Sequence, residues 1–520
     1  MSVMIETLSS DLVFWSRAQF ALTAAYHWIF VPLTIGLVFL IAVMESMYVR
    51  SGNEFWKRCC KFWSRLFAVN FAMGVATGII LEFQFGTNWS NYSWFVGDIF
   101  GAPLAIEGIF AFFMEACFIA VMFFGWDKVS KRFHLASTWL VFVGTCLSAW
   151  WILVANAWMQ NPVGTQFNPD MVRNEMSDFW AVAFSKTAAV KFLHSVLSGL
   201  MLGAAFVTGV SAWFVLKNRE KKFALSSIKL SSLVGLAATL LLILTGDMSA
   251  YDVSKNQPMK LAAIEGLYKG GTSQDLVAVG LLNPDKKTYD DGKKEFLFRI
   301  SIPNMLSFLA TRDFDGYVPG ISDIIEGGYT DSDNQRALSF EEKQLKGRQA
   351  INSLALYRQA KAGKDTAAMN IHAKELNDNI ACFGYGYIDK AEDSVPNVPL
   401  CFYSFRVMVL LGAYFVVFFA LMLFLSKRDM LHKYRWTQYL AVVSIFLAYI
   451  TAQSGWIVAE AGRQPWAIQD ILPVGVGVSS VSVSGVQTTF MIFAILFTLM
   501  LSAMIGIMVK QIRKGPQNEQ

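Results

Sequence analysis

Long runs of apolar residues alternate with short polar stretches along most of the chain. Nine of these runs are roughly 20 residues long, the length that crosses the hydrocarbon core of a bilayer as a helix. They lie at about 20–46, 66–84, 101–125, 136–158, 189–216, 225–248, 401–425, 436–459 and 486–510. The pattern predicts an all-α, polytopic integral membrane protein.

One polar segment interrupts this pattern. Residues 251–400 contain 18 Lys/Arg and 21 Asp/Glu, out of 44 and 39 in the whole chain. The predicted organisation is therefore six membrane helices in 1–248, a polar insert at 249–400 and three membrane helices in 401–520. The chain is 54% hydrophobic and 16% charged, which is typical of a membrane protein. Its net charge of +5 is small and gives no indication of a nucleic-acid partner.

Basic residues gather in alternate loops and in the C-terminal tail. They are Arg50, Lys57, Arg58, Lys61 and Arg65; Lys128, Lys131 and Arg132; Lys217, Arg219, Lys221 and Lys222; Lys427, Arg428, Lys433 and Arg435; and Lys510, Arg513 and Lys514. Because loops rich in Lys and Arg stay in the cytoplasm, the N-terminus and the insert are predicted to lie outside and the C-terminus inside.

Two histidines lie within apolar runs, although the chain has only five histidines. An imidazole in lipid costs free energy unless it is bound or paired, so His27 and His194 are candidates for ligation of haem or metal. The alternative is a histidine hydrogen-bonded to a neighbouring helix. The predicted topology places both near the outer ends of their helices, as it does Met408. Two histidines and a thioether fit haem better than zinc.

Carboxyl groups also occur in the spans. Glu107 and Glu115 are eight residues apart, so they share one helix face, and a proton relay is the favoured interpretation. Protonated glutamates bonded across helices are the alternative. Glu460, in GWIVAEAGRQPW, could ligate a metal centre or take up a proton.

Arginines and tryptophans beside these groups have two interpretations each. Arg406 and Arg463 could pair with haem propionates, or could extend to the membrane interface. Trp456 and Trp466 could belong to an interfacial aromatic belt, which is the safer interpretation from composition alone.

The beginning of the insert carries two charged residues in MKLAAIEGLY. Lys260 and Glu265 could bind and deprotonate a polar headgroup, although a solvated amphipathic stretch has the same charge pattern. Cys382 and Cys401 could form a disulfide in an oxidising compartment, or remain thiols.

Eight motifs together resemble subunit I of the cytochrome bd quinol oxidase family, over nearly the whole chain. They are RAQFALTAAYHWIFVPLT, EFQFGTNWS, GDIFGAPLAIEG, WILVANAWMQNP, VKFLHSVLSG, KLAAIE, FRVM and GWIVAEAGRQPW. The long insert resembles that of the long quinol-loop members. GRQPW after a membrane glutamate and the context of His27 are the most specific of these matches.

The resemblance implies roles for the candidate residues. His194 and Met408 would be the axial ligands of low-spin haem b, and Arg406 would stabilise that haem. His27 would hold haem d, where oxygen binds. Glu460 would be a ligand of high-spin haem b, with Trp456 and Arg463 beside the haem pair. Glu107 and Glu115 would form a proton route. Lys260 and Glu265 would bind quinol.

The resemblance implies a terminal oxidase of the bacterial cytoplasmic (inner) membrane. It would oxidise quinol outside and reduce O₂ to water, building proton-motive force without pumping. Its expected cofactors are two haems b and one haem d. Its expected partners are subunit II, membrane lipid and, in some assemblies, a small single-span subunit. The other functions considered are a proton-coupled transporter and a haem b electron-transfer subunit.

Overall fold

The computed structural model describes residues 9–516. This part of the chain contains nine apolar helical spans that are long enough to cross a membrane. They are α1 (Ser10–Ser51), α2 (Glu54–Thr87), α3 to α4 (Ser90–Phe124), α5 (Lys131–Gln160), α6 to α7 (Phe179–Leu216), α8 (Lys221–Asn256), η3 to α14 (Ala391–Lys427), α15 (Arg435–Ala461) and α17 (Val483–Lys514). The prediction of an all-α polytopic protein is confirmed. The helices are longer than predicted, because the apolar runs mark only their middle parts.

The third span is irregular. It consists of α3 (Ser90–Ile106), a π-helical turn η1 (Glu107–Phe112) and α4 (Phe113–Phe124). Gly97, with φ 40°, breaks the helical path within α3. The widened turn begins at Glu107 itself, and π-turns inside helices are frequent at functional sites. Apolar periodicity cannot predict such a turn.

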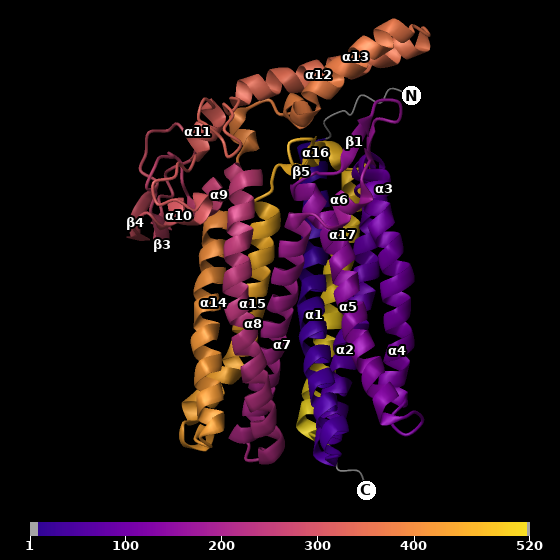
Figure 1. The fold of residues 1–520 in the computed structure, drawn as a ribbon, viewed down its shortest axis with the longest axis vertical. Coiled ribbons are helices and arrows are strands. Elements are labelled where there is room, and N and C mark those ends of the chain that lie inside the picture. Colours follow the sequence, from indigo (N-terminus) through magenta and orange to yellow (C-terminus); the bar gives the residue numbers. More distant parts are fainter. Residues whose placement is uncertain (1–8, 517–520) are drawn as a thin grey trace.

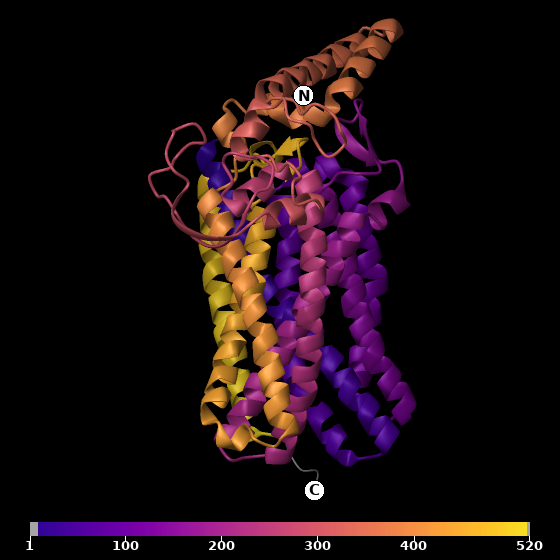
Figure 2. The same cartoon turned by 60° about the vertical axis from the view of Figure 1, so that its left-hand side comes forward.

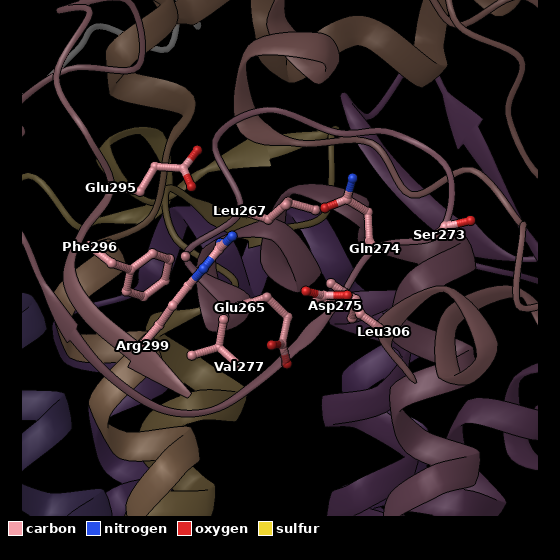
Figure 3. A pocket seen from close by; sticks show the side chains of 11 residues that line it. Glu265, Leu267, Ser273, Gln274, Asp275, Val277, Glu295, Phe296, Arg299 and Leu306 are labelled. Atoms are coloured by element: carbon pink, nitrogen blue, oxygen red, sulfur yellow. The ribbon is translucent and has the colours of Figure 1, made fainter. Parts of the chain in front are cut away.

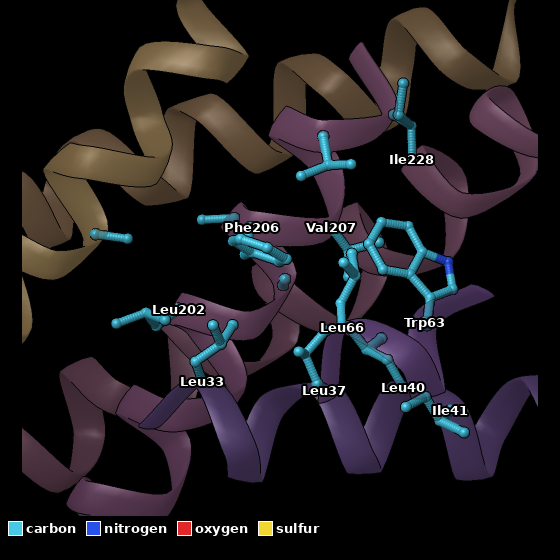
Figure 4. Close-up of a cluster of buried hydrophobic side chains, with 14 of the residues drawn as sticks. Leu33, Leu37, Leu40, Ile41, Trp63, Leu66, Leu202, Phe206, Val207 and Ile228 are labelled. Carbon is cyan, nitrogen blue, oxygen red and sulfur yellow. The ribbon is translucent and has the colours of Figure 1, made fainter. Parts of the chain in front are cut away.

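The spans pack in two groups that share a contact between α1 and α7 (Figures 1 and 2). In one group α7 and α14 each pack against both α8 and α15. In the other, α1 packs against α2, α5 and α17, and α4 packs against α5. Figure 4 shows the core where α1, α2, α7 and α8 meet, built from large aliphatic and aromatic side chains such as Leu37, Trp63 and Phe206.

The α1–α7 contact depends on glycines. A Cβ on Gly36 would overlap the carbonyl oxygen of Gly199 and would lie 2.6 Å from the Cα of Gly203. The two backbones therefore touch directly, as small residues permit in membrane helix pairs. Each of these helices carries one of the candidate histidines, so this contact sets the distance between the helix of His27 and the helix of His194.

The insert lies at one end of the helices (Figure 1). We call this end the insert end; the opposite end, where the loops rich in Lys and Arg join the helices, is the basic end. The insert contains α9 (Pro258–Glu265), β3 (Leu276–Leu282), β4 (Phe296–Ile302), α10 (Met305–Thr311), α11 (Ile321–Glu326), α12 (Phe340–Ala362), α13 (Thr366–Asn379), η2 (Ile380–Tyr387) and η3 (Ala391–Ser394). Strands β3 and β4 pair antiparallel.

Short helices and strands complete the insert end. They are β1 (Thr165–Asn168), β2 (Arg173–Met176), α6 (Phe179–Ala183), β5 (Trp466–Ile468), β6 (Leu472–Pro473) and α16 (Val474–Gly477). At the basic end there is a 3-10 turn, η4 (Leu431–Lys433). Trp466 is buried and its ring lies 4.8 Å from that of Tyr385 in the insert. It therefore ties the loop after α15 to the insert, and the interfacial-belt interpretation of Trp466 is wrong.

Candidate functional site

His27 lies on α1 and faces α2. Its Nδ1 is 3.0 Å from the hydroxyl of Thr77. That hydroxyl has a single hydrogen, which it donates to the α2 carbonyls of Met73 and Gly74, each 3.0 Å away. The hydroxyl must therefore accept the Nδ1–H of His27, which makes Nε2 the unprotonated nitrogen.

His194 has the same surroundings on another pair of helices. It lies on α7, and its Nδ1 is 3.0 Å from the hydroxyl of Thr245 on α8. That hydroxyl also donates to carbonyls of its own helix, at Leu241 and Leu242. Nε2 of His194 is therefore also unprotonated and able to bind a metal ion.

A glycine follows each of these threonines and faces the imidazole ring. A Cβ on Gly78 would lie 3.0 Å from Cε1 of His27, and a Cβ on Gly246 would lie 3.6 Å from Cε1 of His194. The Thr-Gly pair thus fixes the ring from one side with a hydrogen bond and leaves space beside it. A metal-bound histidine usually has such a second hydrogen bond, which sets its tautomer and orientation.

Met408 belongs to the same helix group as His194. It lies on α14, and its Sδ would lie 3.0 Å from a Cβ on Gly455 of α15. The thioether therefore occupies space that a glycine leaves free between α14 and α15. The group formed by α7, α8, α14 and α15 holds an imidazole and a thioether, the pair of ligands that low-spin haem uses in cytochromes c.

Trp456 of α15 connects the two helix groups. Its ring stacks on Trp28, the residue after His27, with centroids 5.1 Å apart and planes 9° apart. One turn earlier on α15, the amide of Gln453 donates to the carbonyl of Ala25 at 2.7 Å. Glu460 lies one turn further along α15. The structure therefore brings the Glu460 region of α15 close to the His27 region of α1.

Glu460 is held by several donors. Arg463 forms an ion pair with its Oε2. Asn156 and Gln160 on α5 donate to its Oε1, at 2.9 and 3.4 Å. The carboxylate is therefore ionised and fixed at the insert end of α15.

Two lysines approach the same carboxylate through these amides. Lys191 Nζ donates to Asn156 at 3.1 Å, and Lys260 Nζ donates to Gln160 at 2.9 Å. Burial lowers the pKa of Lys260 to about 8. With Arg463, three basic side chains thus surround the single carboxylate of Glu460. Sequence reasoning missed Lys191, although a lysine within an apolar span is itself a signal of function.

The residues present fit haem. Propionates would add negative charge, and the site holds more cations than carboxylates. Among the described residues, several buried donors also have no hydrogen-bond partner, including Nε of Arg463, Nε of Arg406 and Nε1 of Trp28. Buried donors of this kind are normally paired, and an anionic group is the partner that suits them.

A row of hydroxyl groups on α5 holds the membrane carboxyl groups. Ser148 donates to Glu107 at 2.6 Å, and Thr145 donates to Glu115. These α5 positions share one face of the helix. The two glutamates are therefore fixed along a common line, as the sequence predicted from their spacing.

A second pair extends this row toward the basic end, and sequence reasoning missed it. Glu45 of α1 accepts from Thr138 at 2.6 Å and lies 2.6 Å from Nδ1 of His134. Both side chains are almost completely buried. An acid in the first predicted span and a histidine two residues before the fourth were the available signals.

Lys260 and Glu265 point in different directions from α9. Lys260 lies against the Glu460 cluster, where it also donates to the carbonyl of Ala459 at 2.9 Å. Glu265 forms a buried salt bridge with Arg406 of α14 at 2.6 Å. The structure therefore does not bring the two predicted quinol residues together, and neither lies on a solvated amphipathic surface.

Glu265 lies at the edge of a cavity of about 240 Å³ inside the insert (Figure 3). Asp275 and Glu295 contribute carboxyl groups, Arg299 a guanidinium, and Val277 and Phe296 apolar walls. Figure 3 shows these side chains arranged around the cavity between β3, β4 and α9. Such a mixture of polar and apolar walls suits a small organic molecule.

The two cysteines near the end of the insert are not bonded. Both Cys382 and Cys401 are free thiols in the structure. Cys401 is buried within α14, where it packs in the insert core. Of the two sequence-based alternatives, the thiols are the one observed.

The fold and the site define a class, a multi-pass membrane protein whose partly buried imidazole, thioether and carboxylate groups are of the kinds that hold haem iron. More narrowly, the chain belongs to the cytochrome bd terminal oxidase subunit I family, whose sequence model matches residues 15–516. Its family is that of terminal quinol oxidases, in which this subunit works with a subunit II.

Two relatives match the chain almost end to end. One is the cytochrome bd-II ubiquinol oxidase subunit 1 of Escherichia coli (strain K12), 39% identical over 515 residues and covering 98% of both chains. The other is the cytochrome bd ubiquinol oxidase subunit 1 of Bacillus subtilis (strain 168), 36% identical over 513 residues, or 98% of this chain and 95% of the relative.

The fold is also similar to a solved structure. The bd oxidase from Geobacillus thermodenitrificans superimposes with a TM-score of 0.77, covering 97% of this chain and 99% of that one at 24% identity. The resemblance seen in the sequence motifs is therefore confirmed at the level of family and fold.

Proposed function

We propose that the protein oxidises quinol at the outer face of a bacterial cytoplasmic membrane and reduces O₂ to water through low-spin haem b, high-spin haem b and haem d. The observation that carries this proposal is the pair of histidines on separate helix hairpins, each with Nε2 freed by a Thr-Gly partner. The insert end then faces outside and the basic end faces the cytoplasm, in agreement with the positive-inside rule.

The candidate ligands divide between the two helix groups. His194 and Met408 would hold low-spin haem b, and His27 would hold haem d. Glu460 would hold high-spin haem b. The cations around Glu460 would receive propionates, as would Arg406. Bound haem would supply one-electron transfer at the His194–Met408 site and oxygen chemistry at the His27 site.

The carboxyl groups along α5 suit a proton route from the cytoplasm. Glu45 lies nearest the basic end, followed by Glu115 and then Glu107, each bonded to a hydroxyl of α5. Protons consumed in forming water would travel along this row. Protons released from quinol would leave on the outer side. Charge would thus be separated across the membrane without a pump.

The insert supplies the surroundings for quinol. Glu265, salt-bridged to Arg406 beside the cavity, is placed to accept a hydroxyl proton. Lys260, which faces the Glu460 cluster, would stabilise negative charge at that cluster. The proposed partners are subunit II, membrane lipid and, in some assemblies, a small single-span subunit.

Replacing Lys260 by alanine or Glu265 by glutamine is expected to lower the rate of quinol oxidation at least about tenfold, with haem content unchanged, since removing one positioned acid–base group typically costs that much or more. Steady-state oxidation of a quinol by the purified complex and a pigment assay measure the two quantities. Lys269, exposed just after α9, provides the control variant Lys269→Ala. Loss of all haems in the Lys260 and Glu265 variants would instead indicate a folding role.

Replacing Thr245 by valine is expected to raise the midpoint potential of the low-spin haem. The hydrogen bond from Nδ1–H makes the imidazole a stronger donor and stabilises the oxidised iron, so its loss favours reduction. A tenfold change in this equilibrium corresponds to about 59 mV for one electron. Redox titration of the α-band measures the shift. Thr239→Val is the control, because Thr239 is buried on the same helix but donates only to Gly235. Equal potentials in the two variants would refute the positioning role of Thr245.

An absorption spectrum of the purified complex tests the proposed function as a whole. A long-wavelength chlorin band together with haem b bands is expected. Haem b alone would favour an electron-transfer subunit, and a colourless protein would favour a transporter. For the transporter, the structure offers no specific support beyond the membrane carboxyl groups.

A further inference from the structure

The β3–β4 hairpin of the insert has two different faces. The pairs Val279–Ile300 and Leu281–Phe298 lie opposite one another in the strand register, so these four side chains share one face. All four are between 43% and 57% exposed. Arg299 lies on the other face and lines the cavity of Figure 3. Val277 and Phe296 line it too, because the strand register shifts between Val277 and Val279 and again between the pairs Leu281–Phe298 and Leu282–Phe296. The hairpin is thus a thin wall with the cavity on one side and an uncovered apolar surface on the other.

This arrangement reverses the usual pattern of a sheet in water. An antiparallel sheet with one solvated face normally turns polar side chains outward. Here the outward face is apolar, and Leu297 and Ile302 on β4 are also exposed. A contiguous exposed apolar patch marks a contact with a membrane or with another protein.

The position of the hairpin indicates whether its exposed apolar face contacts a membrane or another protein. The backbone N–H of Leu282 donates to the hydroxyl of Tyr403 on α14 at 3.0 Å, and the ring of Phe296 lies 5.5 Å from that of Phe402. The hairpin is therefore fastened to the first turns of α14, beside the insert end of that helix (Figure 1).

The same part of α14 presents an apolar stripe. Leu400, Tyr403, Val407 and Leu410 are each between 38% and 51% exposed and lie at helical spacing on one side of α14. On a membrane-spanning helix such a side faces lipid. The apolar face of the hairpin continues this stripe at the height where α14 leaves the membrane.

Charge gives no other explanation for the patch. The loop between the strands, residues 283–295, holds four lysines, three aspartates and one glutamate, so its formal charge is zero. Asp291 binds Lys286 at 2.9 Å and accepts backbone N–H groups of the same loop. The loop thus offers no net charge to attract a charged partner, and attraction must come from the apolar strands.

We propose that the outward face of the β3–β4 hairpin, formed by Val279, Leu281, Phe298 and Ile300, rests in the outer surface of the lipid bilayer as an extension of the lipid-facing side of α14. Its occupant is lipid, not a protein partner. This inference goes beyond the proposed function, because it depends on neither the haem ligands nor the quinol residues.

Spin labels on the assembled holoenzyme in lipid nanodiscs test this contact. A label is attached at Ile300→Cys or, separately, at Leu281→Cys, after Cys117, the exposed native thiol, is replaced by alanine. Val409→Cys on α14, 48% exposed, is the lipid control. Leu345→Cys, 60% exposed, is the water control, and its helix α12 lies beyond the insert end of the membrane helices (Figure 1). Collision rates with O₂ and with a water-soluble nickel chelate are measured for each label.

Labels at positions 300 and 281 are expected to collide with O₂ several-fold more than with nickel, relative to position 345, and to be shallower than position 409. Nickel collisions equal to those at position 345 would overturn the proposal, because the face would then lie in water. Protection from both reagents would also overturn it, since a protein partner would then cover the face. Two separate label sites keep the test decisive if one variant fails to assemble.

Discussion

Replacing His194 by alanine is expected to abolish the low-spin haem signal in the reduced-minus-oxidised spectrum of the purified complex. Nε2 of His194 is the unprotonated nitrogen, because Thr245 accepts the Nδ1 proton. Alanine removes the imidazole that faces this Thr-Gly pair, and the proposed low-spin haem would lose its histidine ligand. The expected change is complete loss of this band.

The matched control is His432→Ala, which removes an exposed histidine at the basic end. Its spectrum should equal that of the unchanged protein. A His194→Ala complex that keeps the low-spin band would refute the ligand assignment. If the band is lost there but Thr245→Val shows no change in potential, only the positioning role of Thr245 is refuted.

Replacing Gly36 by alanine is expected to give the largest loss of stability among single methyl additions in the membrane helices. The new Cβ would overlap the carbonyl oxygen of Gly199 and press on the Cα of Gly203. These are backbone atoms, so the side chain cannot rotate away and α1 must separate from α7. Overpacking of this kind costs about 1–3 kcal/mol or more. Because α1 and α7 carry His27 and His194, the haem-to-protein ratio is expected to fall together with the melting temperature.

Gly412→Ala on α14 is the matched control, since no atom lies within 4 Å of the added Cβ. Melting temperature and haem content are measured for both variants in the same detergent. A Gly36→Ala complex as stable as Gly412→Ala would show that the helices can adjust at this contact without cost.

The nine spans could be predicted from the sequence because a bilayer demands about 20 apolar residues in each. The π-turn at Glu107 could not, since it changes the hydrogen-bond pattern without changing composition. The ends of the helices could not be predicted from the sequence either. α1 begins at Ser10, and its first turns mix polar and apolar residues, which gives no clear hydropathy signal.

Within the site, the sequence revealed the polar residues that are costly in lipid, but not the residues that form hydrogen bonds with them. His27 and His194 stand out in apolar runs, whereas Thr77 and Thr245 are ordinary membrane residues until the helices are paired. The resemblance implied that Lys260 and Glu265 act on one ligand, quinol. Their different directions depend on contacts with α5 and α14, which no local pattern encodes.

The helix hairpins α1–α2 and α7–α8 share the same arrangement of residues. Each carries a histidine on its first helix and a Thr-Gly pair on its second, 50 and 51 residues further along the chain. Everything needed to present a neutral imidazole is therefore encoded locally, and it is encoded twice. Under the proposed function, the two irons differ because of what the other helices bring, a thioether from α14 in one case and the Trp456 region of α15 in the other. A redesign that exchanged only those contributions would be the direct way to convert an electron-transfer site into an oxygen-binding one.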